Sequence, residues 1–193
     1  MLTGKMQFPL ATGFVDKESG ARVRGLIHIA VEEHLLLWTS WRYRSGDEDR
    51  AWDWWSIFRE CKLSGGRLEC FAAVATGNLQ GLMALDLRGK RARTGAAIIV
   101  DYLATNPANR TAAQGLKYVG IGIIAVAIAQ SIERGYGGRI WLESLPGAAS
   151  FYGGLGMAKQ PRRSAEGNLV YTLEAATAEQ LLDEIKRKGI VEL

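Results

Sequence analysis

Residues 117–134 of this chain, KYVGIGIIAVAIAQSIER, decide how the sequence folds. From Gly120 to Arg134 the segment is apolar on nearly all sides of a helix, and Gly135 follows it, which predicts a helix buried against a sheet. Gly120 and Gly122 lie at the start of this helix, where backbone N–H groups lack helical partners and the dipole is positive. The segment therefore predicts a site for an anion such as a diphosphate, unless the glycines only allow close helix–sheet packing.

Strand patterns flank this helix on both sides. Gly77-Asn78 joins two strand-like stretches as a hairpin, and a third stretch has the continuous apolar start of a central strand. From residue 68 onward the predicted order is β-β-β-α-β-α-β-α, which indicates a mixed sheet with helices packed on it. The predicted elements are strands 68–75, 79–87, 96–105, 139–143 and 168–174, a short helix at 147–155, and a terminal helix opened by a capping box at Thr177-Ala178-Glu179-Gln180.

The N-terminal third predicts a hairpin and a helix. Strands at 22–31 and 35–41 are joined by Glu32-Glu33. A helix begins at Ser45 with acidic residues in its first turn and ends near Cys61, and its buried stripe comprises Trp54, Ile57, Phe58 and Cys61.

Composition bounds the class of protein. The 193 residues carry 24 Lys and Arg against 20 Asp and Glu, a net charge of +4, and 48% of them are hydrophobic. This composition excludes a disordered chain, and the length fits one domain, 1–193. Two cysteines (Cys61, Cys70) and two histidines form no zinc-binding pattern, so we expect no metal. The N-terminus has no signal-peptide pattern, and the longest apolar run, 121–129, is too short for a membrane span. We expect a soluble protein of the reducing cytoplasm, without a membrane partner.

Other nucleotide-binding patterns fit the helix start less well. The chain has no Walker A loop. Gly120, Gly122 and Ala125 match a dinucleotide-binding fingerprint, with Glu143 about twenty residues further on. That fingerprint requires a strand directly before the first glycine, and here a polar loop stands there instead, which disfavours a dehydrogenase.

The stretch Ile98–Met157 resembles the core of the Gcn5-related N-acetyltransferase (GNAT) superfamily. A strand ends in YLATNP (102–107), and a Gly-x-Gly helix start, the apolar helix and the strand RIWL (139–142) follow. The segment AASFYGGLGM (148–157) is similar to the closing signature of the family. Two features depart from the family pattern: Lys117 stands where the family usually has Gln or Arg, and the loop before Gly120 is longer.

The resemblance implies an α/β (α+β) fold with a mixed, mostly antiparallel central sheet, helices on both faces and an N-terminal β-hairpin extension. The family core would span 67–174, between an N-terminal part (1–66) that contributes to the acceptor site and a C-terminal helix (175–193). The implied activity is acetyl transfer from the co-substrate acetyl-CoA to a primary amine. The residues implied to bind acetyl-CoA are Leu103, Ala104, Thr105, Lys117, Tyr118, Val119, Gly120, Ile121, Gly122 and Ile123.

Tyr152 matches the family's general acid, which would protonate the leaving thiolate. Asp101 and Glu143 are the candidate bases, and Asp101 is expected to share a strand face with Leu103 and Thr105. His28 and His34 are alternative bases.

Other readings of the function stay open. One alternative is a macromolecular acceptor, such as a protein amine or an aminoacyl-tRNA. For nucleic acid, a basic face would be formed by Arg88–Arg93, Arg162, Arg163 and Lys186–Lys188. A non-catalytic acyl-CoA-binding module is a further alternative. The chain is expected to be a monomer or a homodimer.

Overall fold

The computed structural model describes residues 6–92 and 95–193 of the chain. Within this part, nine strands form one sheet in the order β6-β1-β2-β3-β4-β5-β7-β9-β8. Only β5 and β7 pair in parallel among these strands, so the sheet is mixed and mostly antiparallel. The strands are β1 (Leu10–Asp16), β2 (Arg22–Ile29), β3 (Leu68–Ala75), β4 (Asn78–Ala92), β5 (Gly95–Thr105), β6 (Leu116–Lys117), β7 (Ile140–Ser144), β8 (Ala158–Arg163) and β9 (Leu169–Leu173).

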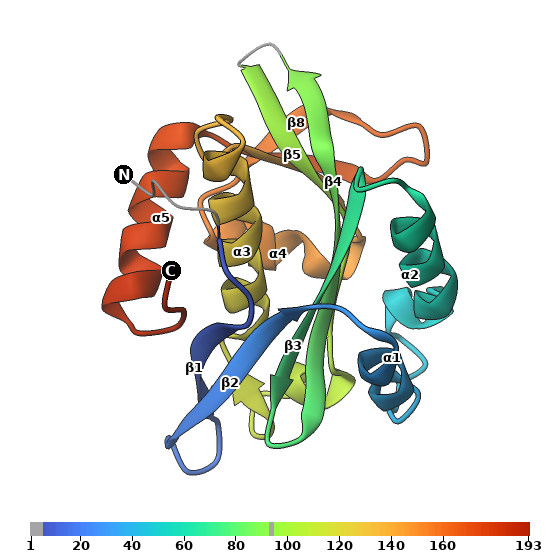
Figure 1. Ribbon diagram of the computed structural model, residues 1–193, viewed down its shortest axis with the longest axis vertical. Coiled ribbons are helices and arrows are strands. Elements are labelled where there is room, and N and C mark those ends of the chain that lie inside the picture. The colour runs from blue at the N-terminus through green and yellow to red at the C-terminus, as the bar shows by residue number, and fades with distance from the viewer. Residues whose placement is uncertain (1–5, 93–94) are drawn as a thin grey trace.

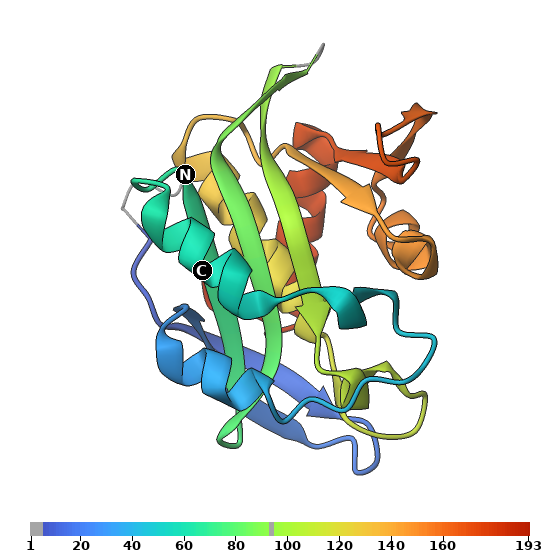
Figure 2. The same ribbon diagram turned by 90° about the vertical axis from the view of Figure 1, so that its right-hand side faces the viewer.

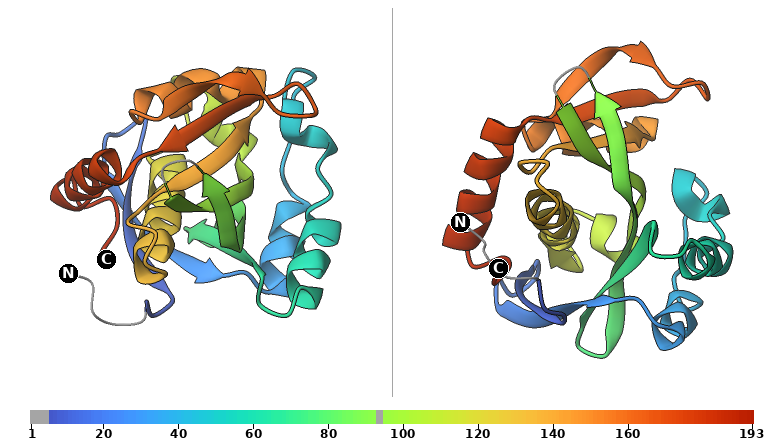
Figure 3. Two further views of the ribbon diagram at one scale, coloured as in Figure 1. Left: turned by 90° about the horizontal axis from the view of Figure 1, so that it is seen from above. Right: turned by 45° about the horizontal axis from the view of Figure 1, so that its top comes forward.

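Helices cover both faces of the sheet. The α-helices are α1 (Glu32–Trp38), α2 (Trp54–Leu63), α3 (Val119–Glu133), α4 (Ala149–Gly154) and α5 (Ala175–Arg187). Helix α3 packs on β3, β4, β5 and β7 with α5 outside it, whereas α1 and α2 pack on the opposite face (Figures 1 and 3). The predicted architecture, a mostly antiparallel mixed sheet between helical layers, is confirmed. None of the helices in the described residues has both the length and the apolar character that a membrane span needs.

The sheet separates two hydrophobic clusters. Successive residues of β3 point to opposite faces, so Phe71 joins the cluster under α3 whereas Ala72 joins the cluster under α2. Trp54 is fully buried at the centre of the α2 cluster. The predicted stripe on α2 (Trp54, Ile57, Phe58, Cys61) is buried, and α3 is buried along most of its length, both as the sequence indicates.

A β-bulge in β5 shapes the centre of the molecule. Ala84 pairs with Tyr102 and Leu85 with Val100, so Asp101 is the extra residue of the bulge. The alternation of side chains shifts there: Val100 belongs to the α3 cluster, and Tyr102 packs on the α2 cluster. Pairing of β5 with β7 extends only from Ile98 to Val100, and the two strands then diverge (Figure 2).

The N-terminal hairpin lies earlier in the chain than the sequence predicts. It consists of β1 and β2, while 35–41, expected as a strand, lies mostly in helix α1. Glu32 and Glu33 favour the first turn of a helix, and the ring Nδ1 of His34 accepts the N–H of Val31 at its start. A short apolar run does not distinguish a strand from a helix by periodicity alone.

Other boundaries also differ from the predictions. Helix α2 begins at Trp54 rather than Ser45, because the Asp53 carboxylate caps it by accepting the N–H of Trp55. Residues 45–53 contain only a short 3-10 helix, Glu48–Ala51. Helix α5 begins at Ala175, which leaves Thr177 inside its first turn rather than at its cap.

Two short strands, β6 and β8, were not predicted, and β4 continues to Ala92 through most of the expected basic turn 88–93. The last residue of that turn, Arg93, lies outside the described residues.

Candidate functional site

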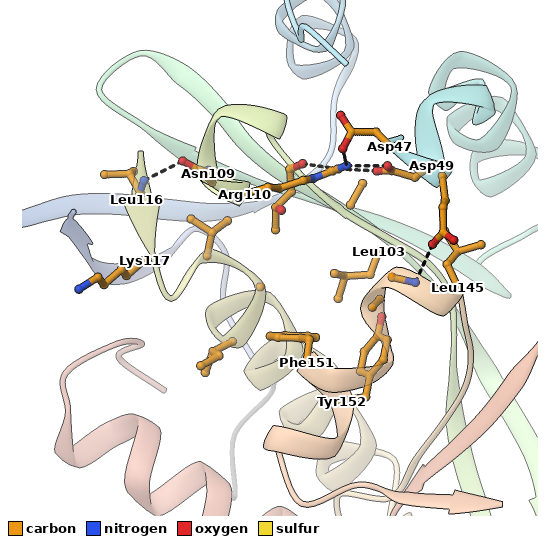
Figure 4. A pocket seen from close by; sticks show the side chains of 18 of the residues that line it. Asp47, Asp49, Leu103, Asn109, Arg110, Leu116, Lys117, Leu145, Phe151 and Tyr152 are labelled. Atoms are coloured by element: carbon orange, nitrogen blue, oxygen red, sulfur yellow. Dashed lines mark hydrogen bonds and ion pairs between the residues drawn. The ribbon is translucent and has the colours of Figure 1, made fainter. Parts of the chain in front are cut away.

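A cavity of about 710 Å³ lies where β5 ends, α3 begins and α4 passes beside them. Figure 4 shows Lys117 at one end of it and Leu103, Leu145 and Tyr152 at the other. Nine of the predicted site residues line it: Leu103, Ala104, Thr105, Lys117, Tyr118, Val119, Gly120, Ile121 and Tyr152. The fold thus brings the end of a strand, the start of a helix and a tyrosine from a later helix to one cavity.

The start of α3 presents free backbone donors to this cavity. Tyr118 precedes the helix in the left-handed conformation (φ 71°), and its side chain does not cap the helix. The N–H of Gly122 donates to the carbonyl oxygen of Tyr118 (2.8 Å), so the free helical donors are the N–H groups of Val119, Gly120 and Ile121. Their orientation suits a bound anion.

Gly122 and Ile123, predicted to bind the co-substrate, do not line the cavity. Their N–H groups are used inside the helix, and Ile123 is fully buried in the core. The lining of the cavity therefore ends two residues earlier than the predicted set, at Ile121. Gly120 does line the cavity, and its lack of a side chain leaves space there, because a Cβ at this position would lie 3.0 Å from Cζ of Phe151.

Two lysines meet at the α3 end of the cavity. Lys117 lies on β6, which pairs with β1, and Lys17 follows β1 directly. The Lys17 ammonium donates to the carbonyl oxygens of Asn109 (2.7 Å) and Thr111 (2.5 Å). Burial and the nearby charge of Lys117 lower the pKa of Lys17. No carboxylate of the described residues forms an ion pair with either lysine, so an anionic ligand would relieve their repulsion.

No pattern in the sequence indicates that Lys17 belongs to the site. It lies one hundred residues before Lys117 and belongs to no local motif. Only the pairing of β1 with β6 brings the two together.

An ion-pair network closes the side of the cavity near α2. The Arg110 guanidinium donates to both carboxylate oxygens of Asp49 (2.7 and 2.6 Å) and to the carbonyl oxygen of Thr105 (2.7 Å). It lies 3.1 Å from an oxygen of Asp47 (Figure 4). Burial alone would lower the pKa of Arg110, but the hydrogen bonds and charges of the two aspartates outweigh it and raise that pKa. Arg110 therefore fixes segment 45–53 to the end of β5.

Tyr152 lies in the wall of the cavity with its ring packed in the core. The ring contacts those of Phe151 (centroids 5.1 Å apart) and Tyr171 (5.9 Å). Its hydroxyl is directed toward the cavity in Figure 4. Burial raises the pKa of Tyr152 to about 12. The phenol thus keeps its proton at neutral pH and is able to donate it.

Solved structures share the fold of this chain. The GNAT domain of PAT from S. lividans superposes with a TM-score of 0.58 at 16% identity, over 84% of this chain and 96% of that one. RimJ from Mycobacterium smegmatis, in complex with CoA-disulfide, gives 0.55 at 12% identity, over 96% and 97% of the two chains. AtaTR bound with AcCoA gives 0.54 at 16% identity, over 81% and 97%. The chain has the GNAT fold.

No protein-family model matches the sequence, and no curated protein matches it either. The identity to the solved structures is low, so the likeness concerns the fold. The GNAT fold agrees with the mixed sheet and the two helical layers that the resemblance implied.

The two candidate bases lie outside the large cavity of this GNAT fold. Asp101 does not share a face with Leu103 and Thr105, because the bulge at Asp101 interrupts the alternation of β5. Glu143 instead lines a second hollow of about 510 Å³ beside β8, where Asn168 Nδ2 donates to its carboxylate (3.5 Å).

Asp101 lies in an acidic environment. Its side chain is exposed, yet the surrounding protein removes part of its hydration, and together with the charge of Asp86 this raises its pKa to about 6. Glu60 and Glu143 act in the same direction, whereas Arg67 opposes them.

The histidines do not reach the cavity. The rings of His28 and His34 lie 5.1 Å apart on β2 and α1, and burial lowers the pKa of both. Across residues 6–92 and 95–193, no three His, Cys, Asp or Glu side chains converge as a metal site would require.

Proposed function

We propose that the protein is an N-acetyltransferase that moves an acetyl group from acetyl-CoA to a primary amine. The observation that carries the proposal is the cavity that joins the free N–H groups of α3 and two lysines, which form no ion pair with a described residue, to the Tyr152 hydroxyl. The GNAT neighbours described as bound with AcCoA and with CoA-disulfide support the same co-substrate. We place this activity in the cytoplasm.

In this proposal the two halves of acetyl-CoA bind different elements. The diphosphate accepts hydrogen bonds from the N–H groups of Val119, Gly120 and Ile121, and Lys117 and Lys17 balance its charge. The pantetheine arm lies along Leu103–Thr105, where β5 has no pairing with β7. Backbone groups there bind its amides in the manner of a strand edge, and one N–H stabilises the thioester oxyanion.

The reaction proceeds through a tetrahedral intermediate. The neutral amine nitrogen attacks the thioester carbon, a C–N bond forms and the carbonyl oxygen becomes an oxyanion. The carbonyl then re-forms as the C–S bond breaks, and the thiolate takes the proton of the Tyr152 hydroxyl. Binding both reactants in one cavity supplies much of the rate enhancement by approximation. Asp101 and Glu143 remain candidates for the base that deprotonates the amine, acting from the α2 face of the sheet.

Calorimetric titration of the purified chain tests the co-substrate. Acetyl-CoA is expected to bind and NAD to give no heat. Lys117→Gln should weaken acetyl-CoA binding about 10-fold through a lost phosphate contact. Lys159→Gln, an exposed lysine on β8, is the matched control and should change nothing.

The shorter thioester S-acetylpantetheine lacks the diphosphate and should not distinguish Lys117→Gln from the wild type. No binding of acetyl-CoA would refute the proposal. Binding without thiol release in the presence of amines would instead favour the non-catalytic module.

A further inference from the structure

Glu48 is the carboxylate in the cavity that no cation neutralises. Segment 45–53 brings three acidic side chains to the lining: Asp47, Glu48 and Asp49. Arg110 binds both aspartates, while Glu48 forms no ion pair with any described residue. The cavity therefore retains one uncompensated negative side chain at this end.

The position of Glu48 is fixed by the loop that leads into α4. Its Oε2 accepts the N–H of Gly147 (2.8 Å), and no described residue donates to its Oε1. The 3-10 turn Pro146–Ala148 runs directly into α4, which carries Tyr152. Glu48 and Tyr152 thus line one cavity although they are far apart in the sequence. The hydrogen bond between Glu48 and Gly147 joins the two segments that carry them.

We propose that Glu48, in place of Asp101 or Glu143, binds the ammonium group of the acceptor and takes up its proton, because Glu48 lines the cavity and the other two carboxylates do not; this inference rests on the proposed function. The acceptor arrives as a cation, R–NH3⁺, which pairs with the carboxylate. One N–H proton passes to a Glu48 oxygen, leaving the lone pair on nitrogen for attack on the thioester carbon. As the C–S bond breaks, Tyr152 protonates the departing thiolate, and the phenolate that this leaves takes the second proton of the nitrogen as the amide forms.

The same charges define the acceptor class. An acceptor with a carboxylate next to its amine would place a negative charge beside Asp47, Glu48 and Asp49, while the Arg110 guanidinium is already occupied. The structure therefore favours a cationic primary amine whose neighbouring atoms are neutral, and disfavours free α-amino acids. Alaninamide and alanine are suitable probes, since they differ in that charge.

The central test is Glu48→Gln, measured with ethylamine and with 2,2,2-trifluoroethylamine as acceptors. Glutamine keeps the size of the side chain and an oxygen for the N–H of Gly147. The affinity for acetyl-CoA should stay within about 2-fold, while kcat/KM for ethylamine falls about 100-fold, as expected for loss of a general base. Trifluoroethylamine is largely neutral at neutral pH, so its kcat/KM should fall less than about 5-fold.

Gly147→Ala provides a second variant that leaves Glu48 unchanged. A Cβ at Gly147 would lie 3.0 Å from Oε2 of Glu48, so the carboxylate has to shift. Its kcat/KM for ethylamine should lie between those of the wild type and Glu48→Gln. Glu33→Gln, an exposed glutamate on α1, is the matched control and should behave as the wild type.

The outcomes separate this inference from the proposed function. A wild-type chain that fails to bind acetyl-CoA refutes the proposed function itself. If acetyl-CoA binds and ethylamine is acetylated, an equal loss for both amines, or no loss, in Glu48→Gln overturns the role of Glu48. The proposed acceptor class is overturned if alanine is acetylated as fast as alaninamide. It is also overturned if none of the four amines (ethylamine, trifluoroethylamine, alaninamide and alanine) is acetylated.

Discussion

Replacing Arg110 by methionine tests whether segment 45–53 is held by charge. Methionine keeps much of the apolar stem but removes the guanidinium, which contacts Asp49, Asp47 and the carbonyl oxygen of Thr105. The Asp49 side chain is only 8% exposed, so the variant leaves a carboxylate that is shielded from water and has lost its cationic partner.

The expected cost follows from this geometry. Removing one partner of a fully buried ion pair costs about 3–5 kcal/mol. The Arg110 side chain is 26% exposed, which screens part of the interaction, so we expect Arg110→Met to lower the free energy of unfolding by about 2–4 kcal/mol. At about 2–4 °C per kcal/mol for a chain of this size, Tm falls by about 4–16 °C.

Urea unfolding followed by tryptophan fluorescence measures this change, since the chain contains six tryptophans. Asp49→Asn and the double variant complete a mutant cycle, in which a coupling energy of about 1–2 kcal/mol is expected. Glu184→Gln, which removes the exposed pair with Lys188, is the control and should not shift the transition measurably. A loss below about 0.5 kcal/mol in Arg110→Met, or strict additivity in the cycle, would refute the reasoning.

Three further predictions concern the cavity and the sheet. Tyr152→Phe should lower kcat, measured by thiol release, about 100-fold or more, while the affinity for acetyl-CoA, measured by calorimetry, stays near that of the wild type. A kcat equal to that of the wild type would exclude Tyr152 as the general acid. Gly120→Ala should weaken acetyl-CoA binding, because the added methyl lies 3.0 Å from Phe151 and narrows the site; unchanged affinity would count against the placement of the diphosphate. The pKa of Asp101 rises from 3.8 to about 6, so the folded state binds this proton more tightly than the unfolded chain. The stability of the fold therefore falls as the pH rises from 3.8 to about 6, and the full loss is present above pH 6. Asp101→Asn should therefore raise Tm at about pH 8 and leave it unchanged near pH 4, and a shift that does not depend on pH would contradict this linkage.

The parts of the fold that the sequence predicts are those with long local patterns. Helix α3 carries an apolar surface over fifteen residues, and β3 to β5 carry strand patterns with a hairpin signal between the first two. Helix α1 is short, and its run of three leucines fits either structure, so its assignment depends on packing. The start of α2 does have a local signal, since Asp53 stands directly before the buried stripe.

The candidate site divides in the same way. The residues contributed by 103–105 and 117–121 and by Tyr152 follow from motif spacing, while Gly122 and Ile123, predicted with them, do not line the cavity. Lys17 and Glu48 reach the cavity only through strand pairing and loop contacts between distant segments. The bulge at Asp101 has no sequence mark, and a single added residue is enough to turn that side chain away from the expected face.

The two hydrophobic clusters divide the core of the molecule into two separate sets of side chains, one on each face of the sheet. The α1–α2 layer and segment 45–53 rest on one cluster, while α3 and α5 belong to the other. Core substitutions on the α2 side therefore change the contacts of a different set of side chains from those under α3. In the proposed function, the residues of the first layer meet the acceptor and those of the second hold acetyl-CoA, so core substitutions on the two sides are expected to alter the two affinities separately.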